Sequence, residues 1–223
     1  MSVSKSVSLG LVIVGAVALC AVAQNKPDAA KPASAPAKAA AGGKIVHGSA
    51  FPSEKCLVSG DPIPADGPVH QVQGRNFHLC CKDCIAELDK NGDTYVKKFD
   101  EAVIAAQKPT YPLDTCPLTG KKTAVQFVVG DRLIQTCCKN CQAKAEKDPS
   151  AALQKIDEAV VAAQKDKYPL KTCVACDKPL GDGAVNCVVG TRLVRVCSDA
   201  CVQAFEKNEA AGLKKLAGGT KTN

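Results

Sequence analysis

Short apolar runs alternate with longer segments of helical periodicity along this chain. The runs at 125–129 and 185–189 are rich in β-branched residues, which favour strands. A Gly-x pair and then an arginine follow each run, and Gly-x is a two-residue hairpin turn. The pattern therefore predicts two β-hairpins, and a matching Gln-Gly-Arg at 73–75 predicts a third. The expected turn pairs are Gln73 with Gly74, Gly130 with Asp131, and Gly190 with Thr191.

Helical periodicity follows each hairpin, with apolar residues three or four positions apart on one face. Asp148 and Pro149 precede the second of these segments as an N-cap and a first-turn proline. The pattern predicts an α+β chain of three tandem hairpin-then-helix modules, of which the last is the shortest. The residues of the predicted helix faces are Val96, Phe99, Val103 and Ala106, then Leu153, Ile156, Val160 and Ala163, and finally Leu213 and Leu216.

Cysteines recur in the same arrangement in every module. A single Cys precedes the hairpin, and a Cys-x3-Cys pair follows it where the helix is expected to begin. Repetition within one chain serves as an internal alignment, so it identifies the cysteines that every module keeps. These are Cys56, Cys80 and Cys84 in module one, Cys116, Cys137 and Cys141 in module two, and Cys173, Cys197 and Cys201 in module three.

Small modules of this kind need reinforcement. Each spans about 60 residues, and the chain has five Phe, three Tyr and no Trp, so metal ions or disulfides are expected to stabilise the folds. Disulfides are the ordinary state of cysteines outside the cytosol, and this alternative stays open. Two observations favour metal. Loss of Cys20 with a signal peptide leaves thirteen cysteines, an odd number. In addition, two of the repeated cysteines, Cys80 and Cys137, are each followed directly by another cysteine, Cys81 and Cys138.

The third module carries the most specific spacing. Cys173-x2-Cys176 and Cys197-x3-Cys201 are two close pairs that can converge on one tetrahedral ion. A helix N-terminus beside the second pair would stabilise negatively charged sulfurs. The spacing therefore predicts a Zn²⁺ site with four thiolate ligands in this module.

These motifs resemble a known family of metal-binding domains. The stretch from Thr172 to Phe205, with Thr-Cys-Val-Ala-Cys and Val-Cys-Ser-Asp-Ala-Cys, is similar to the treble-clef zinc finger of the TRASH domain and of its large-subunit ribosomal relative. Phe77 to Cys84 and Cys116 to Gly120 resemble the related YHS type. The resemblance implies treble-clef-like modules that bind heavy metals, as in sensors, transporters and metal-handling proteins. It carries over no catalytic machinery.

Modules one and two depart from that pattern at one position. Ser59 and Thr119 stand where module three has Cys176, so each of these modules keeps only three aligned thiolates. Three sulfurs suit an exchangeable soft ion such as Cu⁺ better than a permanent structural Zn²⁺. Cys81 and Cys138 either complete these sites or are free, oxidisable thiols, and both interpretations stay open. His70 and His78 are not expected to be ligands.

The N-terminus predicts export. Residues 1–23 have a short polar start, an apolar run and a small-residue cleavage site ending at Ala23, as in a signal peptide. An uncleaved membrane anchor is the alternative, although the apolar run is shorter than the roughly 20 residues a spanning helix needs. Periplasmic or secreted location without stable membrane insertion is expected. The predicted domains are a linker at 24–43, modules at 44–108, 109–166 and 167–217, and a tail at 218–223.

Charge and motifs narrow the function. The formal charge of +7 permits attraction to acidic polymers or anionic lipid, but the lysines are scattered, and no nucleic-acid partner is expected. No haem-attachment motif or phosphate-binding loop is present, so no enzyme is predicted. The favoured hypothesis is an exported protein that stores, buffers or transfers zinc or a softer ion, with a metal transporter or metallochaperone as partner. The alternatives are a secreted scaffold stabilised by zinc or disulfides and a thiol redox protein.

Overall fold

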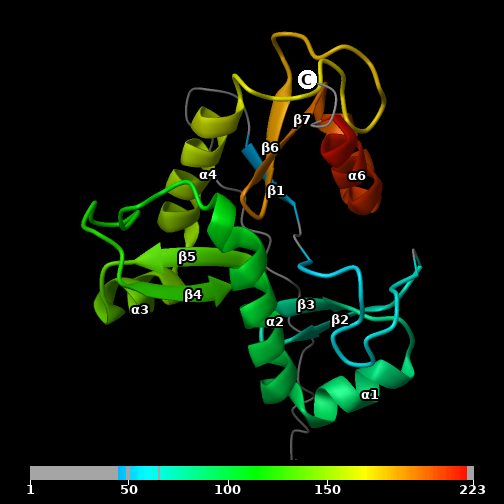
Figure 1. Ribbon diagram of the computed structural model, residues 1–223, viewed down its shortest axis with the longest axis vertical. Coiled ribbons are helices and arrows are strands. Elements are labelled where there is room, and N and C mark those ends of the chain that lie inside the picture. Colours follow the sequence, from blue (N-terminus) through cyan, green and yellow to red (C-terminus); the bar gives the residue numbers. More distant parts are fainter. Residues whose placement is uncertain (1–44, 49–50, 65, 220–223) are drawn as a thin grey trace, which may run out of the picture. The chain divides into compact units, whose positions relative to one another are not determined.

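The computed structural model describes residues 45–48, 51–64 and 66–219 (Figure 1). All of them belong to one compact unit, 37–223. The predicted signal peptide at 1–23 and the whole of the predicted linker at 24–43 lie outside the described residues. The described chain is α+β and consists of three hairpin-then-helix modules, each with a cysteine cluster, as the sequence predicts.

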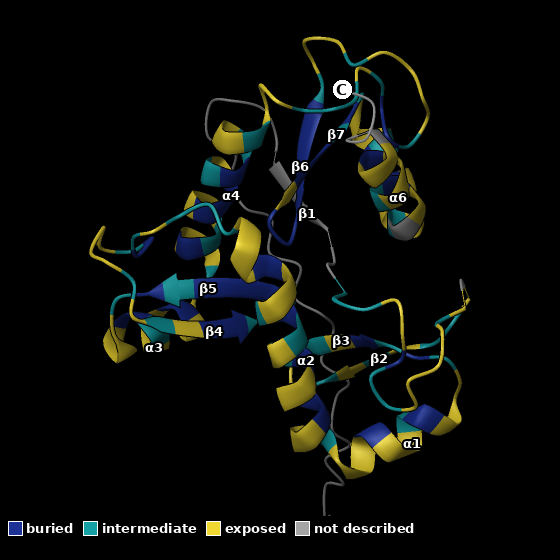
Figure 2. Cartoon of the chain, in the orientation of Figure 1, coloured by how far each residue is buried: buried dark blue, intermediate teal, exposed yellow. Residues whose placement is uncertain are grey.

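Each predicted hairpin is present with its predicted turn. Val72 pairs with Arg75, Val129 with Arg132, and Val189 with Arg192, so each pair closes a two-residue turn. Every residue of the first strand of the third hairpin is buried, whereas the first strand of the first hairpin is partly exposed (Figure 2). The hairpins are β2 (Val69–Val72) with β3 (Arg75–His78), β4 (Val125–Val129) with β5 (Arg132–Thr136), and β6 (Val185–Val189) with β7 (Arg192–Val196).

Two helices follow each hairpin. A short helix begins beside the Cys-x3-Cys pair, and a second one carries the predicted apolar face. Asp148 lies one residue before Pro149, which is the N-cap of the helix Ser150–Gln164, so the predicted cap is shifted by one position. The carboxylate of Asp148 accepts hydrogen bonds from the N–H and the hydroxyl of Ser150, the first residue of that helix. The helices are α1 (Asp83–Lys90), α2 (Gly92–Gln107), the short 3-10 helix η1 (Lys108–Thr110), α3 (Lys139–Lys147), α4 (Ser150–Gln164), α5 (Asp199–Lys207) and α6 (Glu209–Gly219).

Two features differ from the sequence-based expectation. Helix α6 continues through Gly219, into the stretch assigned to the tail. Strand β1 (Ile45–Gly48), in the segment assigned to module one, pairs in parallel with β6 of module three. The strand order in that sheet is β1-β6-β7. Local sequence cannot reveal such pairing, because the partner lies more than a hundred residues away.

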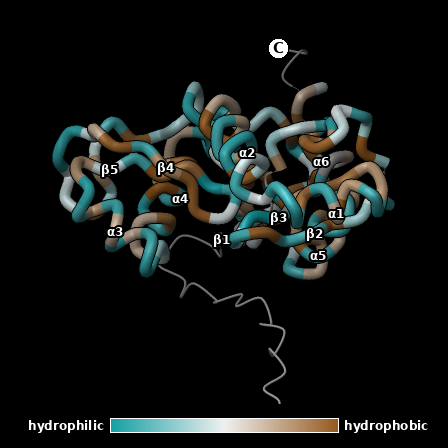
Figure 3. Tube along the Cα trace, turned by 90° about the horizontal axis from the view of Figure 1, so that it is seen from below, coloured by the Kyte–Doolittle hydropathy of each residue, from teal (hydrophilic) through white to brown (hydrophobic). Residues whose placement is uncertain are grey.

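The long helices α2 and α4 each pack on two hairpins. Phe99 of α2 contacts the ring of Phe77 in β3, with the ring centroids 5.0 Å apart, and shares a hydrophobic cluster with Val128 and Leu133 of the next hairpin. Helix α4 repeats this arrangement with hairpins two and three, and Figure 3 shows hydrophobic stretches on α4 and β4. The hydrophobic cluster between α4 and these two hairpins includes Ile134, Ile156, Val160, Val188 and Leu193. Neighbouring modules therefore share their hydrophobic cores.

Glutamine side chains fix the junctions between modules. Gln107 donates to the carbonyl of Asp131 at 2.6 Å and accepts from the N–H of Leu133 at 2.9 Å. Gln164 makes the same pair of bonds to Thr191 and Leu193, at 2.8 Å each. Each glutamine thus uses both ends of its amide to satisfy the edge of the next hairpin, where an unpaired strand edge would otherwise face solvent.

Tyrosines extend these junctions along the same strand edge. The hydroxyl of Tyr111 accepts from the N–H of Gln135, and that of Tyr168 accepts from the N–H of Arg195. In module one the equivalent position, five residues before the first Cys of the cluster, is Phe51. Its ring lies 4.8 Å from that of His78, so an aromatic contact stands where the other modules have a hydroxyl acceptor.

No helix within the described residues is sufficiently long and apolar to cross a bilayer.

Candidate metal centres

A tight turn presents the first cysteine of each cluster. The N–H of Gly60 donates to the carbonyl of Cys56 at 2.8 Å, and Gly120 does the same to Cys116. Asp177 occupies the corresponding place after Cys173 in module three. These turn residues have φ of 84°, 72° and 60°, a left-handed conformation that glycine adopts freely and aspartate tolerates. The turn points the cysteine sulfur toward the Cys-x3-Cys pair.

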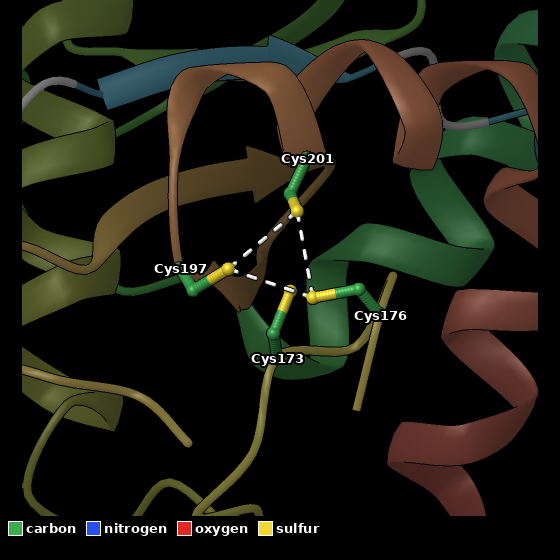
Figure 4. Close-up of side chains that lie close together, drawn as sticks. All are labelled: Cys173, Cys176, Cys197 and Cys201. Atoms are coloured by element: carbon green, nitrogen blue, oxygen red, sulfur yellow. Dashed lines mark hydrogen bonds between the residues drawn. The ribbon is translucent and has the colours of Figure 1, made fainter. Parts of the chain in front are cut away.

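Four sulfurs converge in module three (Figure 4). Cys173 and Cys176 come from the turn, Cys197 follows β7, and Cys201 lies in α5. The three sulfur-to-sulfur distances among Cys176, Cys197 and Cys201 are 3.5, 3.5 and 3.6 Å. A zinc tetrahedron with Zn–S bonds of about 2.3 Å has edges of about 3.8 Å. The cluster is therefore close to the geometry that a metal ion requires.

Modules one and two each gather three sulfurs. Cys56, Cys80 and Cys84 lie with all sulfurs within 4.8 Å of one another, and so do the sulfurs of the second module. The sulfurs of Cys80 and Cys84 are 3.6 Å apart. The corresponding cluster in module two contains Cys116, Cys137 and Cys141. Both clusters can hold a metal ion with three thiolates.

Hydroxyl groups lie where module three has its fourth sulfur. Ser59 Oγ is 3.1 Å from the sulfur of Cys80, and Thr119 Oγ1 is 3.3 Å from the sulfur of Cys137. Cys176 makes the equivalent contact to Cys197. Modules one and two therefore have a neutral hydroxyl oxygen at the point of the cluster where module three has a thiol.

Cys81 and Cys138 lie at the edge of their clusters. The sulfur of Cys81 is 3.8 Å from that of Cys80 and 3.6 Å from that of Cys84, but its side chain is exposed. Cys138 is likewise exposed, with its sulfur 3.8 Å from that of Cys137. Neither belongs to the set of sulfurs that all lie within 4.8 Å of one another.

One thiol in each cluster is prepared for ionisation. Burial raises the pKa of Cys56, but backbone hydrogen bonds from Ser59 and Cys80 outweigh it and lower the pKa to about 7. Burial also raises the pKa of Cys116, but hydrogen bonds from the Thr119 hydroxyl and the backbone of Cys137 outweigh it and lower the pKa to about 6. Burial likewise raises the pKa of Cys173, but backbone hydrogen bonds from Cys197 and Ala175 outweigh it and lower the pKa to about 7.

The partner thiols are shifted in the opposite direction. Burial and the neighbouring thiols raise the pKa of Cys84 and Cys141 to about 12, and contact with Cys176 and Cys201 does the same for Cys197. Several thiolates crowded into one cluster repel each other, so a bound cation is the natural way to ionise them all.

His70 and His78 lie outside the clusters. His70 pairs across the hairpin with Phe77, and its Nε2 lies 2.7 Å from Asp89 Oδ1 at the surface. His78 is half-buried against Phe51 rather than fully solvated, and this burial lowers its pKa despite the charge of Asp131. Cys187, which is not one of the repeated cysteines, is buried in the core of module three.

Sequence reasoning missed the turn that presents the first cysteine. Its signal is a Gly or Asp four residues after that cysteine, which all three modules have at Gly60, Gly120 and Asp177. No family model, curated protein or solved structure matches this chain. The assignment of these centres therefore depends on their geometry and on the internal repeat.

Proposed function

We propose that this is an exported metal-handling protein that stores, buffers or transfers ions through two kinds of thiolate site. Module three holds Zn²⁺ permanently with Cys173, Cys176, Cys197 and Cys201. Modules one and two, which resemble the YHS type of the TRASH family, hold an exchangeable soft ion such as Cu⁺ or a labile Zn²⁺.

The observation that carries this proposal is that modules one and two have a hydroxyl group at the position of the fourth cysteine. Ser59 and Thr119 place a neutral oxygen where Cys176 places a sulfur. A hydroxyl is a poorer ligand than a thiolate for soft ions and for zinc, so a three-thiolate site is more open to an incoming ligand. An open position is what transfer to a receiving protein needs.

Native mass spectrometry of the mature protein, isolated from its own compartment without added metal, tests metal binding. We expect a mass excess that matches bound ions and disappears on denaturation, with the thirteen described cysteines then reduced. A protein without bound metal, lighter by two hydrogens per cysteine pair, would establish a disulfide scaffold instead.

A chelator challenge tests the two classes of site. We expect two ions per chain to leave quickly and one to leave at least tenfold more slowly. Cys176→Ser should make the slow ion fast, and the matched gain-of-ligand variant Ser59→Cys should make one fast ion slow. Equal release rates in all variants would show that the ions are structural and would support a scaffold function.

Export and the absence of catalysis are parts of the same proposal. The signal-like sequence at 1–23 supports cleavage after Ala23. N-terminal sequencing of the protein from the periplasm or medium should begin at Gln24, and a chain that begins at Met1 would contradict export.

The competing redox hypothesis rests on the exposed Cys81, which lies beside Cys84. It predicts that the metal-loaded protein has one thiol that alkylates rapidly and whose loss abolishes disulfide exchange with a dithiol substrate. Metal handling instead predicts unchanged metal transfer after Cys81→Ser.

A further inference from the structure

A repeated ion pair fastens the second hairpin strand to the long helix in modules one and two. Arg75 donates from Nε and Nη2 to the two carboxylate oxygens of Asp100, at 2.9 and 2.8 Å. Arg132 donates from Nη2 to Asp157 at 2.5 Å. Each arginine directly follows its hairpin turn, and each aspartate lies sixteen residues after the last cysteine of its cluster.

Module three keeps the arginine but lacks the acid. Arg192 opens β7 in the same register, and the residue sixteen positions after Cys201 is Ala217. Burial supports this alignment of the second helices of the three modules. The residue directly before the compared position is buried in each module, as Phe99, Ile156 and Leu216. Arg192 is exposed, and no described carboxylate forms an ion pair with its guanidinium.

A pocket of about 420 Å³ lies where the carboxylate is missing. Ala217 and Arg192 both line it, and Lys167 adds a second cation. Tyr168 and Leu216 contribute apolar surface. None of the residues that line the pocket is acidic. A small cavity with an apolar wall and a few convergent polar groups is the usual form of a ligand site.

We propose that this pocket binds a small organic carboxylate. The carboxylate of the ligand pairs with Arg192 as Asp100 and Asp157 pair with their arginines, and Lys167 adds charge attraction. Guanidinium groups suit this ligand because they bind carboxylates through two parallel hydrogen bonds. The apolar part of the ligand packs against Tyr168 and Leu216. This site is separate from the metal clusters and does not depend on the proposed metal function.

Titration of the full-length mature protein, in the state in which it is isolated, with benzoate tests the site, with neutral benzamide as the matched probe. Amide shifts in a two-dimensional NMR spectrum should saturate with benzoate around Lys167, Tyr168 and Arg192. Benzamide should bind at least tenfold more weakly. Arg192→Gln should weaken benzoate binding by a similar factor.

A pair of variants at one position separates charge from space. Ala217→Asp supplies the internal carboxylate of the other modules and should abolish benzoate binding. Ala217→Asn has nearly the same size without the charge and should retain more binding than Ala217→Asp. Thermal unfolding checks that all variants fold. The proposal is overturned if benzoate fails to bind the folded wild type, if benzamide binds equally well, or if Ala217→Asp binds benzoate as the wild type does.

Discussion

Gly212 of α6 lies directly against the ring of Phe205 in α5. A Cβ at Gly212 would be 2.5 Å from Cε2 of that ring. The equivalent pair in module two is Ala145 with Ala152, where a small first residue leaves room for a methyl group. The large ring of module three therefore requires the absence of a side chain on the facing helix.

We expect Gly212→Ala to destabilise the protein by roughly 1–3 kcal/mol, because the methyl group overpacks a buried contact. Gly218→Ala, in the last turn of the same helix, meets no atom within 4 Å and should be neutral or stabilising by about 0.5–1 kcal/mol. Urea unfolding of the metal-loaded proteins measures both. Equal stability of the two variants would contradict the packing argument.

The ion pair of module two is expected to matter more than that of module one. Arg132 and Asp157 are 4% and 1% exposed, whereas Arg75 and Asp100 are 19% and 27% exposed. Asp157→Ala leaves a charged guanidinium in the core and should cost about 3–5 kcal/mol. Asp100→Ala, the matched control, should cost about 1 kcal/mol or less. Urea unfolding gives the comparison, and similar losses for both variants would show that burial does not decide the effect.

Removal of a single hydroxyl tests the junction between modules two and three. Tyr168→Phe deprives the partly buried edge of β7 of an acceptor for the N–H of Arg195. We expect a loss of about 1–3 kcal/mol and faster hydrogen exchange at that amide. The N–H of Leu193 donates a hydrogen bond to the side-chain oxygen of Gln164. This amide serves as the internal control and should stay protected. Unchanged exchange at Arg195 would mean that the hydroxyl does not protect this edge.

Neighbouring cysteines in module two are expected to differ in metal binding. Cys141 is buried within the three-sulfur cluster, and Cys138 is exposed beside it. Cys141→Ser should lower the metal content by one ion per chain in native mass spectrometry, whereas Cys138→Ser should leave it unchanged. The opposite result would make Cys138 a ligand and would move the metal toward the surface of the module.

Much of the local structure follows from particular residues in the sequence. The turns at Gly130 and Gly190 and the strands beside them lie where the pattern predicts, because glycine and β-branched residues act over a few neighbours. Only the Cys-x3-Cys pair predicts the first helix of each module. The pattern does not predict the turn after each lone cysteine, since its signal is a single residue.

The sequence by itself determined the three modules, their hairpins and the cysteines that each brings together. These depend on periodicity and spacing within about 60 residues, which one chain with an internal repeat displays directly. Only the tertiary structure decided that α2 and α4 each pack on two hairpins, that β1 pairs with β6, and that Arg192 and Ala217 line the same pocket. Such contacts join residues far apart in the chain. Their choice depends on which apolar faces and strand edges fit together in space, and no local pattern records that fit.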